Sequence, residues 1–143
     1  MTDTSLPSRS ALAPTAAEVV VGLLGAAVVS IAVNALIALV AGKFIPEGTE
    51  RMGLAVGEYA PATVIGILLG TLGWYLVRRF AGNPRKVLRI LVPAVVVASW
   101  IPDLGILAGG ASIVNSIALI LMHVVVAVAA VPTLSRVLPL GTK

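Results

Sequence analysis

The side chain with the most chemical potential in this sequence is His123, the single histidine among 143 residues. It lies near the middle of an apolar segment, residues 113–134. An ionisable group at that depth of a membrane-spanning helix is rare and costly, and it often belongs to a proton or substrate pathway. Asn115 lies on the same helical face, and Asn34 falls at a similar depth in another apolar segment. Together with Asp103, these three residues form a candidate intramembrane polar site.

Three roles are open to His123. In a structural role the ring is neutral, faces the bundle interior and hydrogen-bonds to Asn34, because an unsatisfied polar group in lipid costs several kcal/mol. In a functional role the ring lies on a proton or substrate pathway. As a haem or metal ligand it could supply only one axial position, and the chain has no cysteine. The sequence favours the structural role and predicts neither a metal site nor a cofactor.

Asp103 is the second candidate, next to Pro102 near the end of the third apolar segment. Either this segment stops at about residue 101 and Asp103 is a turn residue at the interface, or it continues to about residue 107 and Asp103 lines an outward cavity. In both cases we expect no acid beside His123. The sequence has no nucleophile–base pair, phosphate-binding glycine loop or metal-binding motif, so we expect no catalytic residues and no enzyme.

The composition indicates the medium in which these side chains lie. The chain is 59% hydrophobic and 11% charged, against about 45–50% and about 25% in a typical soluble chain. Its mean hydropathy is +1.08. A soluble domain this small could not bury so much apolar surface. Soluble enzymes and disordered chains are therefore excluded, and an integral membrane protein is predicted.

Four apolar segments are long enough to cross a bilayer, and we predict spans at about residues 19–42, 57–79, 87–107 and 113–135. The predicted fold class is all-α, a polytopic bundle of four transmembrane helices within residues 16–137. Thr15 and Glu18 form a capping-box pattern that marks the first helix start. Residues 1–15 are predicted to be a disordered cytoplasmic tail, and residues 138–143 a second cytoplasmic tail.

Basic residues predict the orientation. Eight of the ten Lys and Arg residues fall in the two tails and the loop after the second span, whereas Lys43 and Arg51 lie on the opposite side. This asymmetry places both termini in the cytoplasm of a bacterial plasma membrane. The loop cluster also suits anionic lipid headgroups, and we expect the bilayer, rather than nucleic acid, to be its partner. The cluster consists of Arg78, Arg79, Arg85, Lys86 and Arg89.

Small residues recur every fourth position in the first two spans, and such stripes let helix backbones approach closely. In the first span the stripe includes Gly22, Ala26 and Ser30, and in the second it includes Gly66 and Gly70. We expect these faces to pack within one monomer. The alternative is contact with a second copy of the chain or with another membrane protein.

Two stretches carry a resemblance to known sequences. Residues 72–80 read Leu-Gly-Trp-Tyr-Leu-Val-Arg-Arg-Phe before a basic linker, and residues 121–127 read Leu-Met-His-Val-Val-Val-Ala before Val131-Pro132. Over roughly residues 55–137 the chain resembles an uncharacterised family of small four-span actinobacterial membrane proteins. The resemblance implies a fold and a membrane location, and no activity.

Two functions are compatible with these residues. The first is a non-enzymatic scaffold, self-associating protein or accessory subunit. The second is a small transporter or channel that uses the polar site around His123. An open cavity that reaches the imidazole would favour the second function, and a closed, hydrogen-bonded ring would favour the first.

Overall fold

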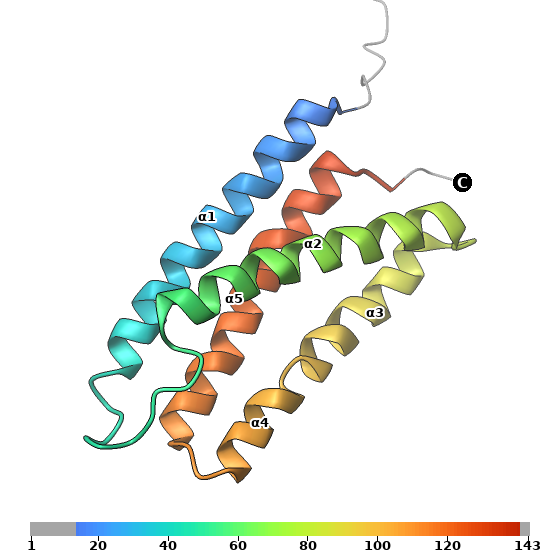
Figure 1. The fold of residues 1–143 in the computed structure, drawn as a ribbon. Helices are drawn as coiled ribbons and strands as arrows, with labels where there is room; N and C mark the ends of the chain where they lie inside the picture. Colours follow the sequence, from blue (N-terminus) through green and yellow to red (C-terminus); the bar gives the residue numbers. More distant parts are fainter. Residues whose placement is uncertain (1–13, 141–143) are drawn as a thin grey trace, which may run out of the picture.

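The computed structural model describes residues 14–140, and every regular element in this range is an α-helix (Figure 1). Four stretches are long and apolar enough to cross a membrane, and α3 and α4 together make the third. The predicted all-α, four-span fold class is confirmed. Residues 1–13 and 141–143, which hold most of the two predicted tails, lie outside the described residues. The helices are α1 (Ala16–Ala41), α2 (Val56–Phe80), α3 (Pro84–Ala98), α4 (Ile101–Ala108) and α5 (Ile113–Val137).

Local side-chain caps set where three of the helices begin. At α1 the Glu18 amide donates to Thr15 Oγ1 at 3.2 Å, and the Thr15 amide donates to the Glu18 carboxylate at 2.7 Å, which completes the capping box. Asn83 caps α3 by accepting from the Lys86 amide at 3.1 Å. Ser112 caps α5 by accepting from the Val114 amide at 3.2 Å. Each cap satisfies a backbone N–H that a helix start would otherwise leave without a partner.

The third span consists of two consecutive helices, and a short turn between them interrupts the helical hydrogen bonds. It ends as α3 at Ala98 and resumes as α4 at Ile101 after a turn at Ser99 and Trp100. Proline lacks a backbone N–H and fits the first turn of a helix, so Pro102 explains a restart at this point. Of the two alternatives left by the sequence, the longer span is the one observed. Asp103 consequently lies in the first turn of α4, inside the span.

The closest packing in the molecule is between α1 and α5. A Cβ added at Gly22 would lie 2.8 Å from Val137 Cγ1 and 3.2 Å from Thr133 Cγ2, so only glycine fits there without a shift. Ala26 and Ser30, one and two turns further along, are buried. Lipid supplies no hydrophobic force between helices, and close backbone approach along such a stripe replaces it.

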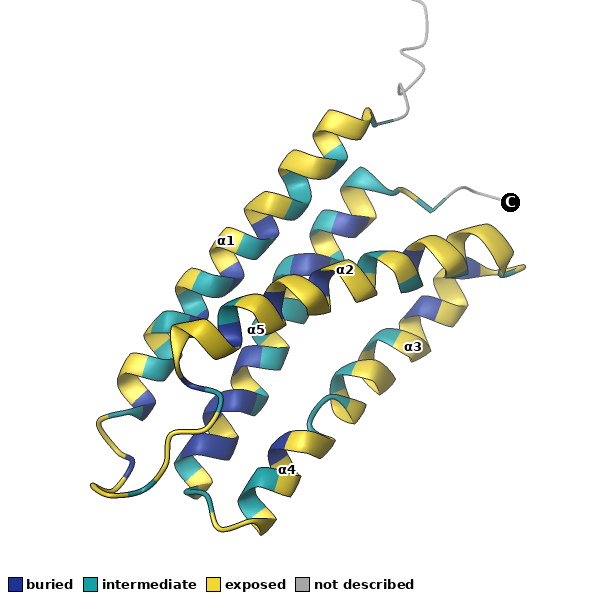
Figure 2. Ribbon diagram, in the orientation of Figure 1, coloured by how far each residue is buried: buried dark blue, intermediate teal, exposed yellow. Residues whose placement is uncertain are grey.

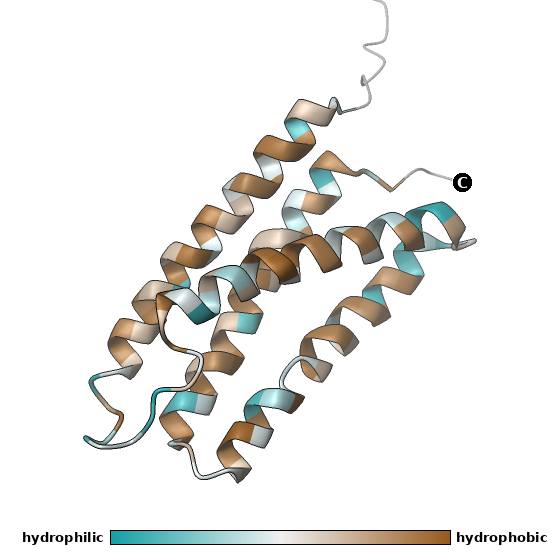
Figure 3. Cartoon of the chain, in the orientation of Figure 1, coloured by the Kyte–Doolittle hydropathy of each residue, from teal (hydrophilic) through white to brown (hydrophobic). Residues whose placement is uncertain are grey.

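Apolar and polar side chains share the interior, and apolar side chains cover much of the outside. The largest fully buried side chains are Asn34, Asn115, Ser30 and Ser116. Exposed faces of the helices carry leucine, valine and isoleucine, as the burial and hydropathy colouring shows together (Figures 2 and 3). This distribution suits a chain whose surroundings are lipid tails.

The second span departs from the packing that its sequence predicts. Gly66 and Gly70 were expected to contact another helix closely, yet a Cβ added at either would meet nothing within 4 Å. Two hydrogen bonds join α2 to the rest of the bundle on either side of these glycines. Thr63 accepts from Asn34 Nδ2 at 3.2 Å, and the Trp74 indole donates to the Leu138 carbonyl at 3.0 Å. Between these contacts the glycine face opens onto a cleft. The expectation of close packing at Gly66 and Gly70 was wrong.

The fit at Gly22 leads to a stability prediction. Gly22→Leu forces a branched side chain into Val137 and Thr133, and such overpacking costs about 1–3 kcal/mol. We expect a lower melting temperature in detergent. Gly25→Leu is the matched control, because Gly25 lies on the exposed face of the same helix with nothing within 4 Å. Equal melting temperatures for the two variants would contradict the α1–α5 contact.

Candidate functional site

A cleft of about 650 Å³ lies between α2 on one side and α3, α4 and α5 on the other. Glycines of α2 form one wall, and aliphatic side chains of α3 and α5 form much of the rest. The third span, which bounds the cleft, has the smallest share of buried residues of the four spans. The volume is that of an ordinary small-molecule site. The wall residues include Gly66, Gly70, Leu91, Val95, Met122 and Val126.

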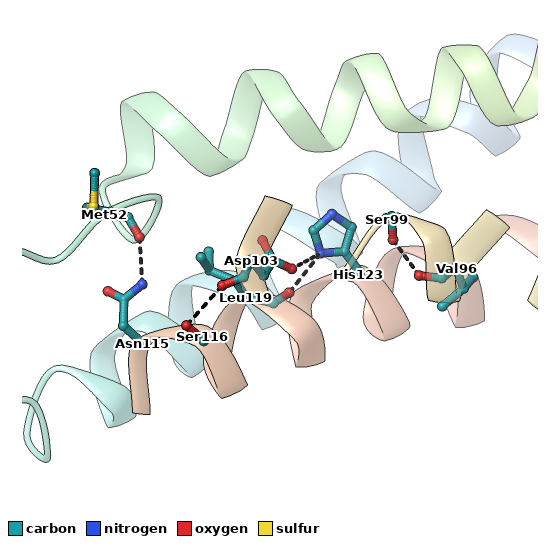
Figure 4. Close-up of polar contacts among 8 residues, drawn as sticks. All are labelled: Met52, Val96, Ser99, Asp103, Asn115, Ser116, Leu119 and His123. Carbon is teal, nitrogen blue, oxygen red and sulfur yellow. Dashed lines mark hydrogen bonds and ion pairs between the residues drawn. The ribbon is translucent and has the colours of Figure 1, made fainter. Parts of the chain in front are cut away.

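His123 and Asp103 lie side by side on the wall of this cleft (Figure 4). Nδ1 of His123 is 3.1 Å from Oδ2 of Asp103 and 2.9 Å from the Leu119 carbonyl oxygen. The Asp103 side chain is 6% exposed and the His123 side chain is 40% exposed. The carboxylate is therefore covered, while the imidazole is open to the cleft.

This pair overturns the expectation that no acid lies beside His123. The restart of the third span at Ile101 places Asp103 in a helix that packs on α5. The Ser116 hydroxyl then fixes the position by donating to the Asp103 backbone carbonyl at 3.1 Å. A helix that ended at residue 101 would have left the carboxylate at the interface instead.

The neighbours of Nδ1 determine which ring nitrogen carries the hydrogen. Both the Leu119 carbonyl and the Asp103 carboxylate accept hydrogen bonds, and a carbonyl oxygen can never donate one. Nδ1 is therefore assigned as N–H. The second nitrogen, Nε2, points away from Asp103 in Figure 4. It holds a lone pair when the ring is neutral and an N–H when the ring is charged.

Asp103 depends on His123 for its charge balance. Among the described residues, its buried Oδ2 accepts no hydrogen bond of good geometry, so the 3.1 Å approach of the imidazole is its compensation. Burying a lone carboxylate is costly, and a pair with no net charge costs least in apolar surroundings. Adding one proton to the pair brings its net charge to zero, and removing that proton leaves one negative charge.

The two asparagines of the predicted site lie elsewhere. Asn34 bonds to Thr63 rather than to His123, so the expected hydrogen bond between Asn34 and His123 was wrong. Asn34 still borders the cleft, and its Oδ1 is without a partner among the described residues. Asn115 donates from Nδ2 to the Met52 carbonyl at 2.9 Å, which ties α5 to the loop before α2. It does not line the cleft.

Sequence reasoning missed two polar residues of α2 that line the cleft. Thr63 is buried and accepts the Asn34 amide, and Tyr59 is buried one turn before it. A signal for Thr63 was present, because it is a hydroxyl inside an apolar span and next to the small-residue stripe. The partner of that hydroxyl could not be read from one sequence.

The basic residues gather at the junction of α2 and α3, away from the Asp103–His123 pair. All five side chains of the predicted headgroup cluster are exposed, and the guanidinium of Arg79 lies 5.6 Å from the Phe80 ring centroid. Within residues 14–140 no group of three or more His, Cys, Asp or Glu side chains is placed to hold a metal ion.

The tautomer assignment can be measured directly because the chain has a single histidine. Protein purified with a tag that contains no histidine and labelled with ¹⁵N-histidine gives one pair of ring signals. At a pH where the ring is neutral, we expect the proton on Nδ1 and none on Nε2. A neutral ring with its proton on Nε2 would contradict the contacts to Leu119 and Asp103.

Comparisons with known proteins identify a family and no activity. No match was found among curated proteins or among solved structures. A family model described only as a family of unknown function matches residues 10–139, which include all four spans and the Asp103–His123 pair. Because the match extends over most of the sequence, the chain belongs to the family of unknown function DUF6069.

Proposed function

We propose that this protein is a small, non-enzymatic membrane carrier that binds a solute in the cleft and couples it to protonation of Asp103 and His123. One observation supports the proposal above the others. A protonatable pair, with 3.1 Å between Nδ1 and Oδ2, lies on the wall of a cleft of about 650 Å³ between membrane spans. Ionisable groups inside transmembrane bundles commonly serve proton and substrate pathways.

The exposure of His123 argues against a purely structural role. A histidine that only holds helices together would be covered and would use both ring nitrogens. Here 40% of the side chain is exposed, and its one hydrogen bond within the described residues runs to Leu119 in its own helix. The ring contacts α4 through the Asp103 carboxylate at 3.1 Å, and its exposed part is available to a solute.

A second candidate function is that of an accessory subunit or self-associating protein. The bare wall formed by Gly66, Gly70 and Gly73 favours it, because a Cβ added at any of the three would meet nothing within 4 Å. Small-residue faces accept a helix of a second copy or of another membrane protein. In that case the inserted helix would fill the cleft and cover His123.

For orientation, we propose a multi-pass protein of the bacterial plasma membrane with both termini in the cytoplasm and the bilayer as its surroundings. The support is the distribution of basic residues: eight are in the two tails, at the C-terminal end of α5 and at the adjoining ends of α2 and α3, and Lys43 and Arg51 are in the α1–α2 loop. Basic residues are retained on the cytoplasmic side. The basic cluster would then contact anionic lipid headgroups.

Fusion of a reporter that is active only in the cytoplasm tests this orientation. We expect activity from fusions at the N-terminus and at the C-terminus, and none from an insertion after Gly48 in the α1–α2 loop. Activity from one terminus alone would contradict an even number of spans. Activity at the loop alone would reverse the orientation.

Proton movement tests the carrier. Liposomes that contain the protein and a trapped pH-sensitive dye are given a potassium gradient, and valinomycin sets the voltage that drives protons inward. We expect faster acidification than in protein-free liposomes. Asp103→Asn and His123→Leu should return the rate to that of protein-free liposomes, because each removes one member of the pair.

Thr71→Val is the matched control for this experiment. It removes a hydroxyl that bonds within α2, to the Ile67 carbonyl at 2.7 Å, and does not line the cleft. Its rate should equal that of the wild type. If the wild-type protein acidifies no faster than protein-free liposomes, the carrier proposal fails. In that case, an assembly with a second copy or another membrane protein in which His123 is covered would support the accessory-subunit function.

A further inference from the structure

The cleft carries an uneven set of charges. Among the described residues that line it, Glu58 and Asp103 are acids, and neither lysine nor arginine is present. This is notable in a chain with ten basic residues and six acidic ones. His123 is the only group on the wall that can become positive, and it is already engaged by Asp103. When the Asp103–His123 pair is deprotonated, the fixed charge presented to an occupant is therefore negative.

Two buried acceptors on this wall lack hydrogen-bond partners. Asn34 is 1% exposed and Asp103 is 4% exposed, and in the described residues neither Oδ1 of Asn34 nor Oδ2 of Asp103 accepts a hydrogen bond. Buried acceptors without hydrogen bonds are uncommon in folded proteins, and Oδ2 of Asp103 has only the approach of His123 Nδ1 at 3.1 Å as compensation. Figure 4 also shows the other carboxylate oxygen of Asp103 and Nε2 of His123 pointing away from α5, toward α2. A lipid tail or an apolar helix face would bring no positive charge to the carboxylate.

The rest of the wall is apolar. Leu91, Val95, Met122 and Val126 surround the polar patch, and the glycines of α2 leave room opposite to it. Carboxylates are common ligands of inorganic divalent cations, and within residues 14–140 no group of three or more His, Cys, Asp or Glu side chains is placed to hold a metal ion. A solute with a bulky apolar part would pack against these walls, and a positive charge on that solute would be attracted to the acidic side chains.

We propose that the cleft binds an amphipathic monovalent cation, a lipophilic amine or quaternary onium ion, with its charge beside Asp103. This inference rests on the proposed carrier function and names the class of its solute. Opposite charges attract strongly in a medium of low dielectric constant. The apolar walls then bind the hydrophobic part of the solute, as in most small-molecule sites.

The same geometry makes the cation and the proton compete. The deprotonated pair carries one negative charge, and either a proton or a monovalent cation brings the net charge to zero. When the pair is protonated, binding of the cation releases that one proton, and charge balances on both sides of this exchange; when the pair is deprotonated, the cation binds without proton release. Reciprocity requires that added protons weaken cation binding by the same factor.

Few other titratable groups face the pair. Glu58 and Tyr59 of α2 line the cleft, together with Asp103 of α4 and His123 of α5. Glu58 is engaged at the start of α2, where its carboxylate accepts the Ala55 amide at 3.1 Å. The basic residues of α3 do not line the cleft, and α1 contributes only the uncharged Asn34. The pH dependence of binding is thus expected to follow the Asp103–His123 pair.

Binding of tetraphenylphosphonium to the full-length protein in nanodiscs tests this inference. Tetraphenylborate is the matched probe, because it has the same shape and the opposite charge. After subtraction of binding to empty nanodiscs, we expect saturable binding of tetraphenylphosphonium and none of tetraphenylborate. The affinity should fall as the pH is lowered, and at a pH where the pair is protonated about one proton should be released per bound cation.

Variants separate the site from general hydrophobic binding. Asp103→Asn should weaken tetraphenylphosphonium binding at least tenfold and abolish proton release, whereas Glu50→Gln, at an exposed loop residue that does not line the cleft, should retain both. Gly66→Leu fills the cleft where an added Cβ meets nothing within 4 Å, so it should also lose binding while remaining folded. Gly25→Leu, on the exposed face of α1, should bind as the wild type does.

Opposite results would overturn the inference. Equal saturable binding of both probes, or loss of binding in Glu58→Gln with retention in Asp103→Asn, would show that Asp103 does not hold a cation. If proton flux depends on Asp103 but tetraphenylphosphonium does not bind, the carrier proposal stands and lipophilic cations are excluded as its solute. Cation binding that depends on Asp103 without proton flux would support the cation site and remove the carrier proposal.

Discussion

The close approach of α1 and α5 is the contact on which the rest of the structure depends. Lipid tails are as apolar as leucine, so helices in a bilayer gain little by hiding apolar side chains from it. Gly22, Ala26 and Ser30 remove the side-chain bulk that would keep the two backbones apart. Once α5 is fixed on α1, its other face is free to carry His123 toward the cleft. The remaining helices are then arranged around that face.

Much of the fold could be predicted from the sequence because a bilayer imposes few solutions. A spanning segment must satisfy its own backbone hydrogen bonds, so an apolar run of sufficient length implies a helix. The Thr15–Glu18 capping box marks the start of α1 as the sequence indicated. The two small-residue stripes show where this reasoning ends. Gly22 contacts α5 tightly, while Gly66 and Gly70 border open space. Spacing alone does not say whether a partner helix lies opposite.

The same reasoning identified only part of the candidate site. The position of His123 within an apolar run identified it as unusual, and nothing beyond the local sequence was needed. Its partner was misassigned because pairing across helices depends on how the third span is broken and turned. The restart of α4 at Ile101 and the bond from Ser116 to the Asp103 carbonyl bring the carboxylate to the imidazole. Such a placement depends on tertiary structure, and the depth of each residue in its own span did not reveal it.

The position of Asp103 is difficult to explain by stability. A buried ion pair is weak support for a fold, since the desolvation of two charges commonly equals or exceeds their attraction. Ser116 already joins α4 to α5 through the Asp103 backbone, and that bond would survive any side chain at this position. The carboxylate thus adds a cost that the helix contact does not require. Its one evident consequence is to hold Nδ1 of His123 and leave Nε2 available to the cleft. A polar pair that costs stability and presents a free nitrogen to an open cavity is best understood as a binding site.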